Sequence, residues 1–172
     1  MTRLLSTLFL LGAALGTAPI PALAQQQARP QSLGTFQEWT AASLGSGAQK
    51  VCYAFTRATR SDGAGTRQNV MLTVTHRSGG RDQVSLRSGY AYARNAEVTV
   101  DVGSTELDFF TAQENAFARE GTRTVAAFKA GASAVAKGSG PNGRGTATDT
   151  FSLSGFTAAY DAISKECPAG RR

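Results

Sequence analysis

Hydrophobic and polar residues alternate most clearly in "EVTVDVGSTELDFFT", residues 97–111. Gly103 and Ser104 fit the two central positions of a tight hairpin turn. This turn sets a register in which Asp101 faces Glu106, and it separates an apolar face from a polar one. The apolar face carries Val98, Val100, Val102, Leu107 and Phe109. Because the turn residues and the alternation agree, they predict an antiparallel hairpin over residues 97–111.

Shorter alternating segments lie on both sides of this hairpin. "KVCYAFTR" (50–57) predicts a strand with Cys52 and Ala54 on one face. "NVMLTVTH" and "DQVSLRSG" are separated by a glycine-containing turn and predict a hairpin over residues 69–88. "ASAVAKGSG" and "GRGTATDTFSLS" predict two further strands, joined across "GSGPNGRG" (138–145). We interpret that glycine-rich connection as a hairpin loop, because it lacks the lysine-serine ending of phosphate-binding loops.

Helical spacing occurs in two places. Residues 122–131 predict a short helix that Gly131 ends. Residues 154–166 predict a C-terminal helix with Ser154 as its N-cap and with Phe156 and Ile163 on its apolar face. The expected fold is therefore mainly β: an antiparallel β-sandwich or flattened barrel with two short helices, one of them C-terminal.

The N-terminal region has the pattern of a secretory signal peptide. Arg3 precedes an apolar run from Leu4 to Leu15, and Ala22-Leu23-Ala24 matches the small-x-small cleavage pattern. A retained anchor is the alternative, but the run is shorter than the roughly 20 residues that span a membrane. We expect a signal peptide over 1–24 with cleavage before Gln25, a disordered leader over 25–34, a single β-rich domain over 35–168 and a basic tail over 169–172. The expected location is the periplasm or the medium, and the mature protein is not expected to span a membrane.

The chain has two cysteines, Cys52 and Cys167. An even number of cysteines in an exported protein predicts a disulfide. The alternative is a redox-active pair, but the wide spacing excludes a local redox motif. We expect the bond to attach the C-terminal helix to the strand that carries Cys52 and Ala54.

Several stretches resemble the invasion associated locus B family of exported bacterial proteins. They are "QVSLRSGYAYARNAEVTVDVGSTELDFFT" (83–111), "VAAFKAGASAVAKG" (125–138) and "GRGTATDTFSLSGFTAAYDAISKEC" (143–167). "FQEWT" (36–40) is similar to the tryptophan-bearing first strand of the family. Many members place a cysteine four residues after that tryptophan, where this chain has Ser43. The resemblance implies an association with host-cell invasion, and it brings no enzymatic activity, cofactor or catalytic residue.

Candidate catalytic groups are few. His76 is the single histidine, and its place before "RSGGR" predicts a solvated residue at a strand end. There is no G-x-S-x-G nucleophile motif, and with both thiols paired no transition-metal ligand cluster remains. We therefore expect no metal and no cofactor. Asp101, Glu106 and Asp108 share one face of the predicted hairpin and could bind a hard cation or act as an acid/base pair; a solvated polar face is the simpler interpretation.

The formal net charge is +6, and basic residues are concentrated between Lys50 and Arg94. Loops at one end of a sandwich could bring arginines together in a basic patch, with Arg57, Arg60, Arg67, Arg77 and Arg81 as its candidates. Ordinary arginine-rich solubility is the alternative. Tyr90 and Tyr92 are two residues apart and fit either an exposed interface or, as we favour, the core. We do not expect a nucleic-acid partner, because no aromatic platform is interleaved with the basic residues.

The sequence thus favours an exported, non-enzymatic envelope or secreted protein. Its expected partner is an anionic envelope component or a host or bacterial protein. The alternative is a small hydrolase that uses the acidic face of the 97–111 hairpin. A pocket beside Asp101 and Glu106 would favour the hydrolase, whereas a flat, solvated face would favour the binding protein.

Overall fold

Strands are the main secondary structure of the protein, whose computed structural model describes residues 29–169. The strands are β1 Gln31–Phe36, β2 Trp39–Leu44, β3 Val51–Arg57, β4 Arg60–Asp62, β5 Met71–Arg77, β6 Gly80–Arg87, β7 Glu97–Val102, β8 Thr105–Ala112, β9 Asn115–Ala118, β10 Ser133–Ser139 and β11 Thr146–Ser152. The helices are α1 Gly121–Ala130 and α2 Phe156–Glu166, with 3-10 turns at Gly47–Gln49 and Pro141–Gly143. The predicted signal peptide lies outside the described residues.

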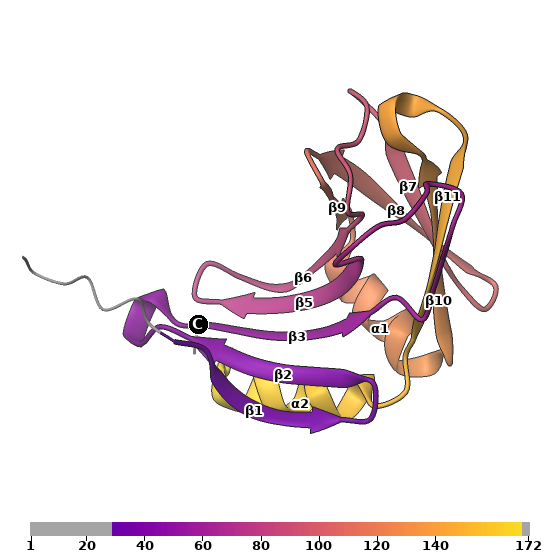
Figure 1. The fold of residues 1–172 in the computed structure, drawn as a ribbon. Coiled ribbons are helices and arrows are strands. Elements are labelled where there is room, and N and C mark those ends of the chain that lie inside the picture. The colour runs from indigo at the N-terminus through magenta and orange to yellow at the C-terminus, as the bar shows by residue number, and fades with distance from the viewer. Residues whose placement is uncertain (1–28, 170–172) are drawn as a thin grey trace, which may run out of the picture.

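All the strand pairings are antiparallel, and they join eleven strands in the order β1-β2-β3-β5-β6-β9-β8-β7-β10-β11-β4. Figure 1 shows two slabs at an angle, one with β1, β2, β3, β5 and β6 and the other with β7, β8, β10 and β11. β4 follows β3 closely in the chain but pairs with β11 at the far end of the order, and the Thr59 amide donates to the Thr150 carbonyl at 2.8 Å. This crossing links the two slabs. The predicted class, mainly antiparallel β with two short helices, one of them C-terminal, is confirmed.

The hairpin predicted over residues 97–111 has the predicted register. Asp101 pairs with Glu106, and Val102 pairs with Thr105. β5 and β6 form the hairpin predicted over 69–88, and β10 and β11 form the one predicted across 138–145. These elements are correct because each combines an alternating pattern with its own turn residues.

Three strands were not predicted. β1 begins at Gln31 and so includes the last four residues of the leader that we expected to be disordered. β4 and β9 are also absent from the prediction, and each has only three or four residues. β1 and β4 are mostly exposed polar segments that become strands by pairing with β2 and β11, which a local pattern does not encode.

The start of α2 differs from the prediction. The N-cap is Gly155, at φ 88°, and no side chain caps the helix. Ser154 instead bonds through its hydroxyl to the side chain of Gln37. A Cβ at position 155 would lie 1.9 Å from the Phe36 carbonyl oxygen. Glycine therefore allows the helix to start directly against the turn between β1 and β2.

The hydrophobic core joins α2 to the first slab. Phe156 packs against Trp39 and Phe128, with ring centroids 4.9 and 5.4 Å away. The predicted disulfide between Cys52 and Cys167 is present, with the Cα atoms 6.0 Å apart. It attaches the end of α2 to the β3 face that carries Cys52 and Ala54, as expected. Within residues 29–169, no helix is both long and apolar enough to cross a membrane.

Candidate functional site

Within residues 29–169, the helices cover one face of the first slab and leave the opposite face uncovered (Figure 1). α2 contacts β1, β2, β3 and β5, and α1 contacts β6. On the uncovered face, a row of directly paired residues crosses five strands in the order Phe55, Thr73, Ser85, Phe117 and Phe110. Small hydroxyl residues therefore lie between two aromatic ends. We call this surface the outer face.

Two parallel rows extend the outer face toward the turn between β5 and β6. Tyr53, Thr75 and Gln83 form the first, and Val51, Arg77 and Gly80 form the second. The aromatic residues at each end are stacked. The ring centroids are 6.1 Å apart for Tyr53 and Phe55 and 5.6 Å apart for Phe110 and Phe117.

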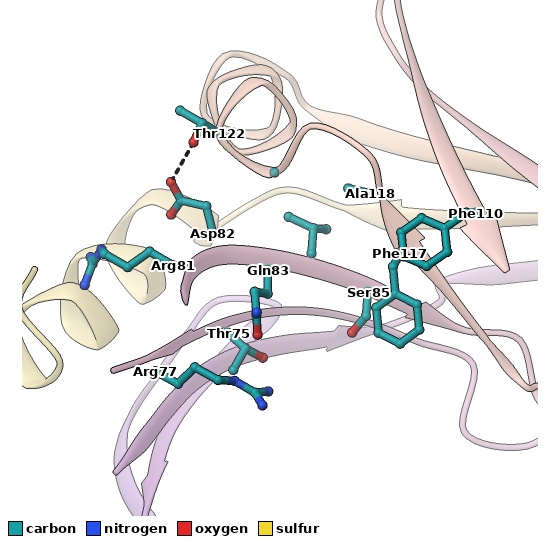
Figure 2. Close-up of a pocket in the computed structure, with 12 residues that line it drawn as sticks. Thr75, Arg77, Arg81, Asp82, Gln83, Ser85, Phe110, Phe117, Ala118 and Thr122 are labelled. Atoms are coloured by element: carbon teal, nitrogen blue, oxygen red, sulfur yellow. Dashed lines mark hydrogen bonds between the residues drawn. The ribbon is translucent and has the colours of Figure 1, made fainter. Parts of the chain in front are cut away.

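A solvent-open hollow of about 470 Å³ lies on the outer face beside the start of α1 (Figure 2). We call it the outer-face hollow. Six residues of the outer face line it: Thr75, Arg77, Gln83, Ser85, Phe110 and Phe117. Phe110 is 43% exposed, which is unusual for a phenylalanine in this protein. The other wall comes from the edge of β6 and from Gly121 and Thr122 of α1.

A β-bulge in the β5–β6 hairpin determines which face of the sheet each of its charged side chains lies on. Thr75 pairs with Gln83 and Arg77 pairs with Gly80, so Arg81 and Asp82 both lie opposite His76. Asp82 has a positive φ of 53°. A bulge of this kind redirects side chains, and here Arg81 and Asp82 turn toward the helices. Figure 2 shows Arg77 and Gln83 on the outer face and Arg81 extending away from them toward α2.

On the helix side, the bulge builds a buried polar cluster around His76. The ring is 0% exposed, and its Nδ1 accepts a hydrogen bond from the Asp82 amide at 3.2 Å. The Nε2 atom lies 3.1 Å from the hydroxyl oxygen of Ser164. The Asp82 carboxylate accepts from the hydroxyls of Tyr160 at 2.8 Å and Thr122 at 3.2 Å. The prediction of a solvated His76 is therefore wrong, because α2 covers this end of β5.

Ser164, His76 and Asp82 are the residue types of a hydrolytic triad, but their hydrogen bonds run in the wrong direction. Burial, followed by the positive charge of Arg81, lowers the pKa of His76, so the ring is neutral near pH 7. Since Nδ1 accepts from an amide, the ring proton is assigned to Nε2, which donates to Ser164. A general base must accept a proton from its nucleophile. The cluster therefore acts as a structural link between α2 and the β5–β6 hairpin.

The structure does not bring the five candidate arginines together. Arg57 and Arg77 lie at opposite ends of the β3–β5 pair, about 20 Å apart by strand geometry. Arg60 pairs with Asp62 at 2.7 Å, and Arg81 donates to the Cys167 carbonyl and to Ser164. Among residues 29–169, the Arg77 side chain forms no ion pair or hydrogen bond, and it is exposed. Arg77 is therefore the arginine available to a ligand at the outer-face hollow.

Arg67 has a different environment from the other four, because its side chain is only 2% exposed. Its two Nη atoms donate to the Asp149 carboxylate at 2.8 and 2.6 Å, and Nη1 also donates to the Ser88 carbonyl. Tyr90 and Tyr92 pack edge to face beside this pair, and both are half-buried. Arg67 thus belongs to a buried ion pair and contributes nothing to a surface patch.

The acidic face of the β7–β8 hairpin has the expected residues, and it lies apart from the outer-face hollow. Asp101 lies opposite Glu106, and Asp108 lies on the same face, opposite Thr99. The Asp101 carboxylate pairs with Lys137 at 3.0 Å. These three carboxylates do not line the outer-face hollow. In the part of the chain that the structure describes, no group of three or more His, Cys, Asp or Glu residues could hold a metal ion.

Of the residues that line the outer-face hollow from the outer face, Arg77 alone was identified as a candidate from the sequence. Strand alternation carried part of the signal, because Phe110 directly follows the buried Phe109 and must point outward. The same alternation could have revealed the burial of His76, which shares a face with Leu72 and Val74. Phe117 could not be placed, because β9 was not predicted.

Comparison with known protein families matches residues 39–164 to the family described as "Invasion associated locus B (IalB) protein". Comparisons with curated proteins and with solved structures gave no match. The matched range runs from Trp39 in β2 to Ser164 in α2, so it includes the outer-face hollow and the His76 cluster. The match covers well over half of the chain and agrees with the stretches that carry the resemblance. The chain is a member of the invasion associated locus B family.

Proposed function

We propose that this protein is an exported, non-enzymatic binding protein, and that its binding surface is the outer-face hollow. One observation carries the proposal: Arg77, which has no partner within the described residues, opens onto the same solvent-exposed hollow as the stacked pair Phe110 and Phe117. Binding sites commonly combine aromatic walls with a few polar groups in this way. The partner is an anionic component of the envelope or a protein that carries a matching negative charge.

The family and the disulfide support an extracytoplasmic role. The family description names an invasion-associated protein. The bond between Cys52 and Cys167 is typical of proteins in oxidising compartments. We infer a periplasmic or secreted location, reached through a signal peptide that is cleaved before Gln25.

A hydrolase that uses the acidic face gains no support from the geometry. Lys137 already neutralises part of that face, and the outer-face hollow lies elsewhere. The His76 cluster has catalytic residue types but lacks an accessible base. Binding is the function that the arrangement favours.

The test is retention of a soluble envelope extract on the immobilised protein at increasing salt. We expect at least one retained component, eluted as ionic strength rises because salt screens the charge of an exposed arginine. Arg77→Gln should abolish retention. Arg57→Gln is the matched control, since it removes the same charge from the far end of the same strands. Equal retention by both variants, or none by the wild type, would contradict the proposal.

A further inference from the structure

We propose that the outer-face hollow binds an acidic sugar, with its carboxylate on Arg77 and its ring against Phe110 and Phe117. This inference rests on the proposed function, because it names the class of ligand for the same surface. Three features of the hollow carry it: its charge, its floor and its aromatic wall.

The charge of the hollow favours a negative ligand. Arg77 is exposed and has no partner among residues 29–169, and a guanidinium binds a carboxylate through two parallel hydrogen bonds. Asp82 also lines the hollow. Its carboxylate, however, already accepts hydrogen bonds from Tyr160 and Thr122. Arg81 lies at the rim and is held by α2. The free charge that faces a ligand is therefore that of Arg77.

The floor offers side chains and no free main chain. Thr75 and Ser85 pair across the ladder with Gln83 and Phe117. Among residues 29–169, the β6 edge before Ser85 has no strand partner on the β9 side, but the start of α1 lies against it, with Gly121 packed on the Asp82 carbonyl. Their hydroxyls and the Gln83 amide form no side-chain hydrogen bond within the described residues. The Gln83 side chain lies over Gly80, where a Cβ would be 2.8 Å from its Nε2 atom.

This floor fits a sugar better than a peptide. Hydroxyl and amide groups both donate and accept hydrogen bonds, as the hydroxyls of a sugar do. An extended peptide instead gains most from the unpaired main chain of a sheet edge. The face of a paired sheet lacks such groups, so recognition depends on the side chains.

The aromatic wall completes the match. Phe110 is 43% exposed and is stacked with Phe117, and the Arg119 guanidinium carbon lies 5.8 Å from the Phe110 ring centroid. Phe117 and Arg119, which pairs with Glu97, contact the ring, and its exposed part is what a ligand can reach. The C–H face of a sugar ring is apolar and can pack on it, while the hydroxyls at the ring edge reach the floor. A volume of about 470 Å³ suits one or two sugar rings.

The test is a titration of the isotope-labelled protein with acidic oligosaccharides, followed by NMR. The two acidic probes are a hyaluronan tetrasaccharide, which represents host glycans, and the inner-core oligosaccharide of lipopolysaccharide, which represents the bacterial envelope. Maltotetraose is the neutral control. We expect at least one acidic probe to shift Arg77, Gln83 and Ser85 at concentrations up to about 10 mM, and the tighter probe identifies the source.

Variants separate charge from packing. Arg77→Gln should weaken binding of the acidic probe by about tenfold or more and leave maltotetraose unchanged, because only the charged contact is lost. Phe110→Ala should weaken binding of any sugar, and Arg57→Gln should bind as the wild type does. Both substituted side chains in the hollow are exposed, so the amide spectrum should report an intact fold.

Two outcomes would overturn the inference. One leaves the proposed function intact, and the other contradicts it as well. If neither acidic oligosaccharide binds in an Arg77-dependent way but an acidic peptide or a component of the envelope extract does, the sugar assignment is wrong and the proposed function stands. If no probe and no extract component depends on Arg77, both are wrong.

Discussion

At the scale of single residues, Arg67 and Asp149 form a buried ion pair with two hydrogen bonds. Both side chains are almost fully buried, at 2% and 5% exposure, and two parallel hydrogen bonds join them. A buried charge that loses its partner remains desolvated and uncompensated. Removing one member should therefore lower the free energy of unfolding more than removing both members does.

We predict that Arg67→Met lowers the free energy of unfolding by about 3–5 kcal/mol. The double variant Arg67→Met/Asp149→Leu should be more stable than Arg67→Met alone, because no unpaired charge is then buried. Urea denaturation of the wild type, both single variants and the double variant measures this. A loss below about 1 kcal/mol for Arg67→Met, the value typical of surface ion pairs, would contradict it.

His76 should make stability depend on pH. Burial, with a smaller contribution from the Arg81 charge, lowers the pKa of His76 from its usual 6.5 in the folded protein, although the nearby Asp82 acts in the opposite direction. Tyr160 and Ser164 also face the ring. Between the two pKa values the unfolded chain binds more protons, so the free energy of unfolding falls as the pH drops below 6.5 and levels off below the folded pKa.

The prediction for His76 is a comparison of pH profiles. Denaturation between about pH 8 and about pH 5 should show a steeper loss for the wild type than for His76→Gln, which cannot titrate there. The other acidic and basic groups are common to both proteins. Parallel profiles across this range would show that protonation of His76 does not destabilise the folded protein.

At the scale of elements, α2 is held by three kinds of contact. Phe156 packs in the core, the His76 cluster binds Ser164 and Tyr160, and the disulfide fixes Cys167 directly after the last turn. The bond closes a loop with a sequence separation of 115, for which chain entropy alone contributes up to about 4–5 kcal/mol. The sheet has its own ladders and does not need this bond locally.

We therefore predict that reduction, or Cys167→Ser, loosens α2 before the sheet. Hydrogen exchange on oxidised and reduced protein should show faster exchange in the last turn of α2, with the β5 and β7 amides nearly unchanged. The expected stability loss is up to a few kcal/mol. Equal acceleration in the central strands would mean that the bond supports the whole fold.

Sequence reasoning succeeded for elements that are determined locally and failed for those determined by distant partners. The β7–β8 register followed from Gly103 and Ser104, and the disulfide followed from there being two cysteines in a chain predicted to be exported. The burial of Arg67 depends on Asp149, which is 82 positions away, and no local pattern links them. The outer-face hollow likewise needs β6, β9 and β8 side by side, so its members could not be grouped from their spacing.

At the scale of the whole molecule, the fold places the core and the proposed binding surface on opposite sides of one slab. The helices, the disulfide and the His76 cluster hold the inner side, and the outer side is left free. Such a division suits a protein that presents a fixed surface to a partner, because ligand contacts need not disturb the core.

Export is the second prediction at this scale. We predict that the mature protein begins at Gln25, because Ala22-Leu23-Ala24 is the well-placed cleavage pattern. N-terminal sequencing of protein recovered from the periplasm or the medium checks this. A chain that still begins at Met1 would mean that the segment is retained.

The central claim is that the outer-face hollow, and neither the acidic face nor the His76 cluster, is where this protein meets its partner. The most direct measurement is an amide NMR map of the labelled protein before and after addition of the soluble envelope extract. We predict perturbations centred on Arg77, Gln83, Ser85 and Phe117 and little change at Asp101 and Glu106. Perturbations centred on the acidic hairpin, or none on the outer face, would contradict the account.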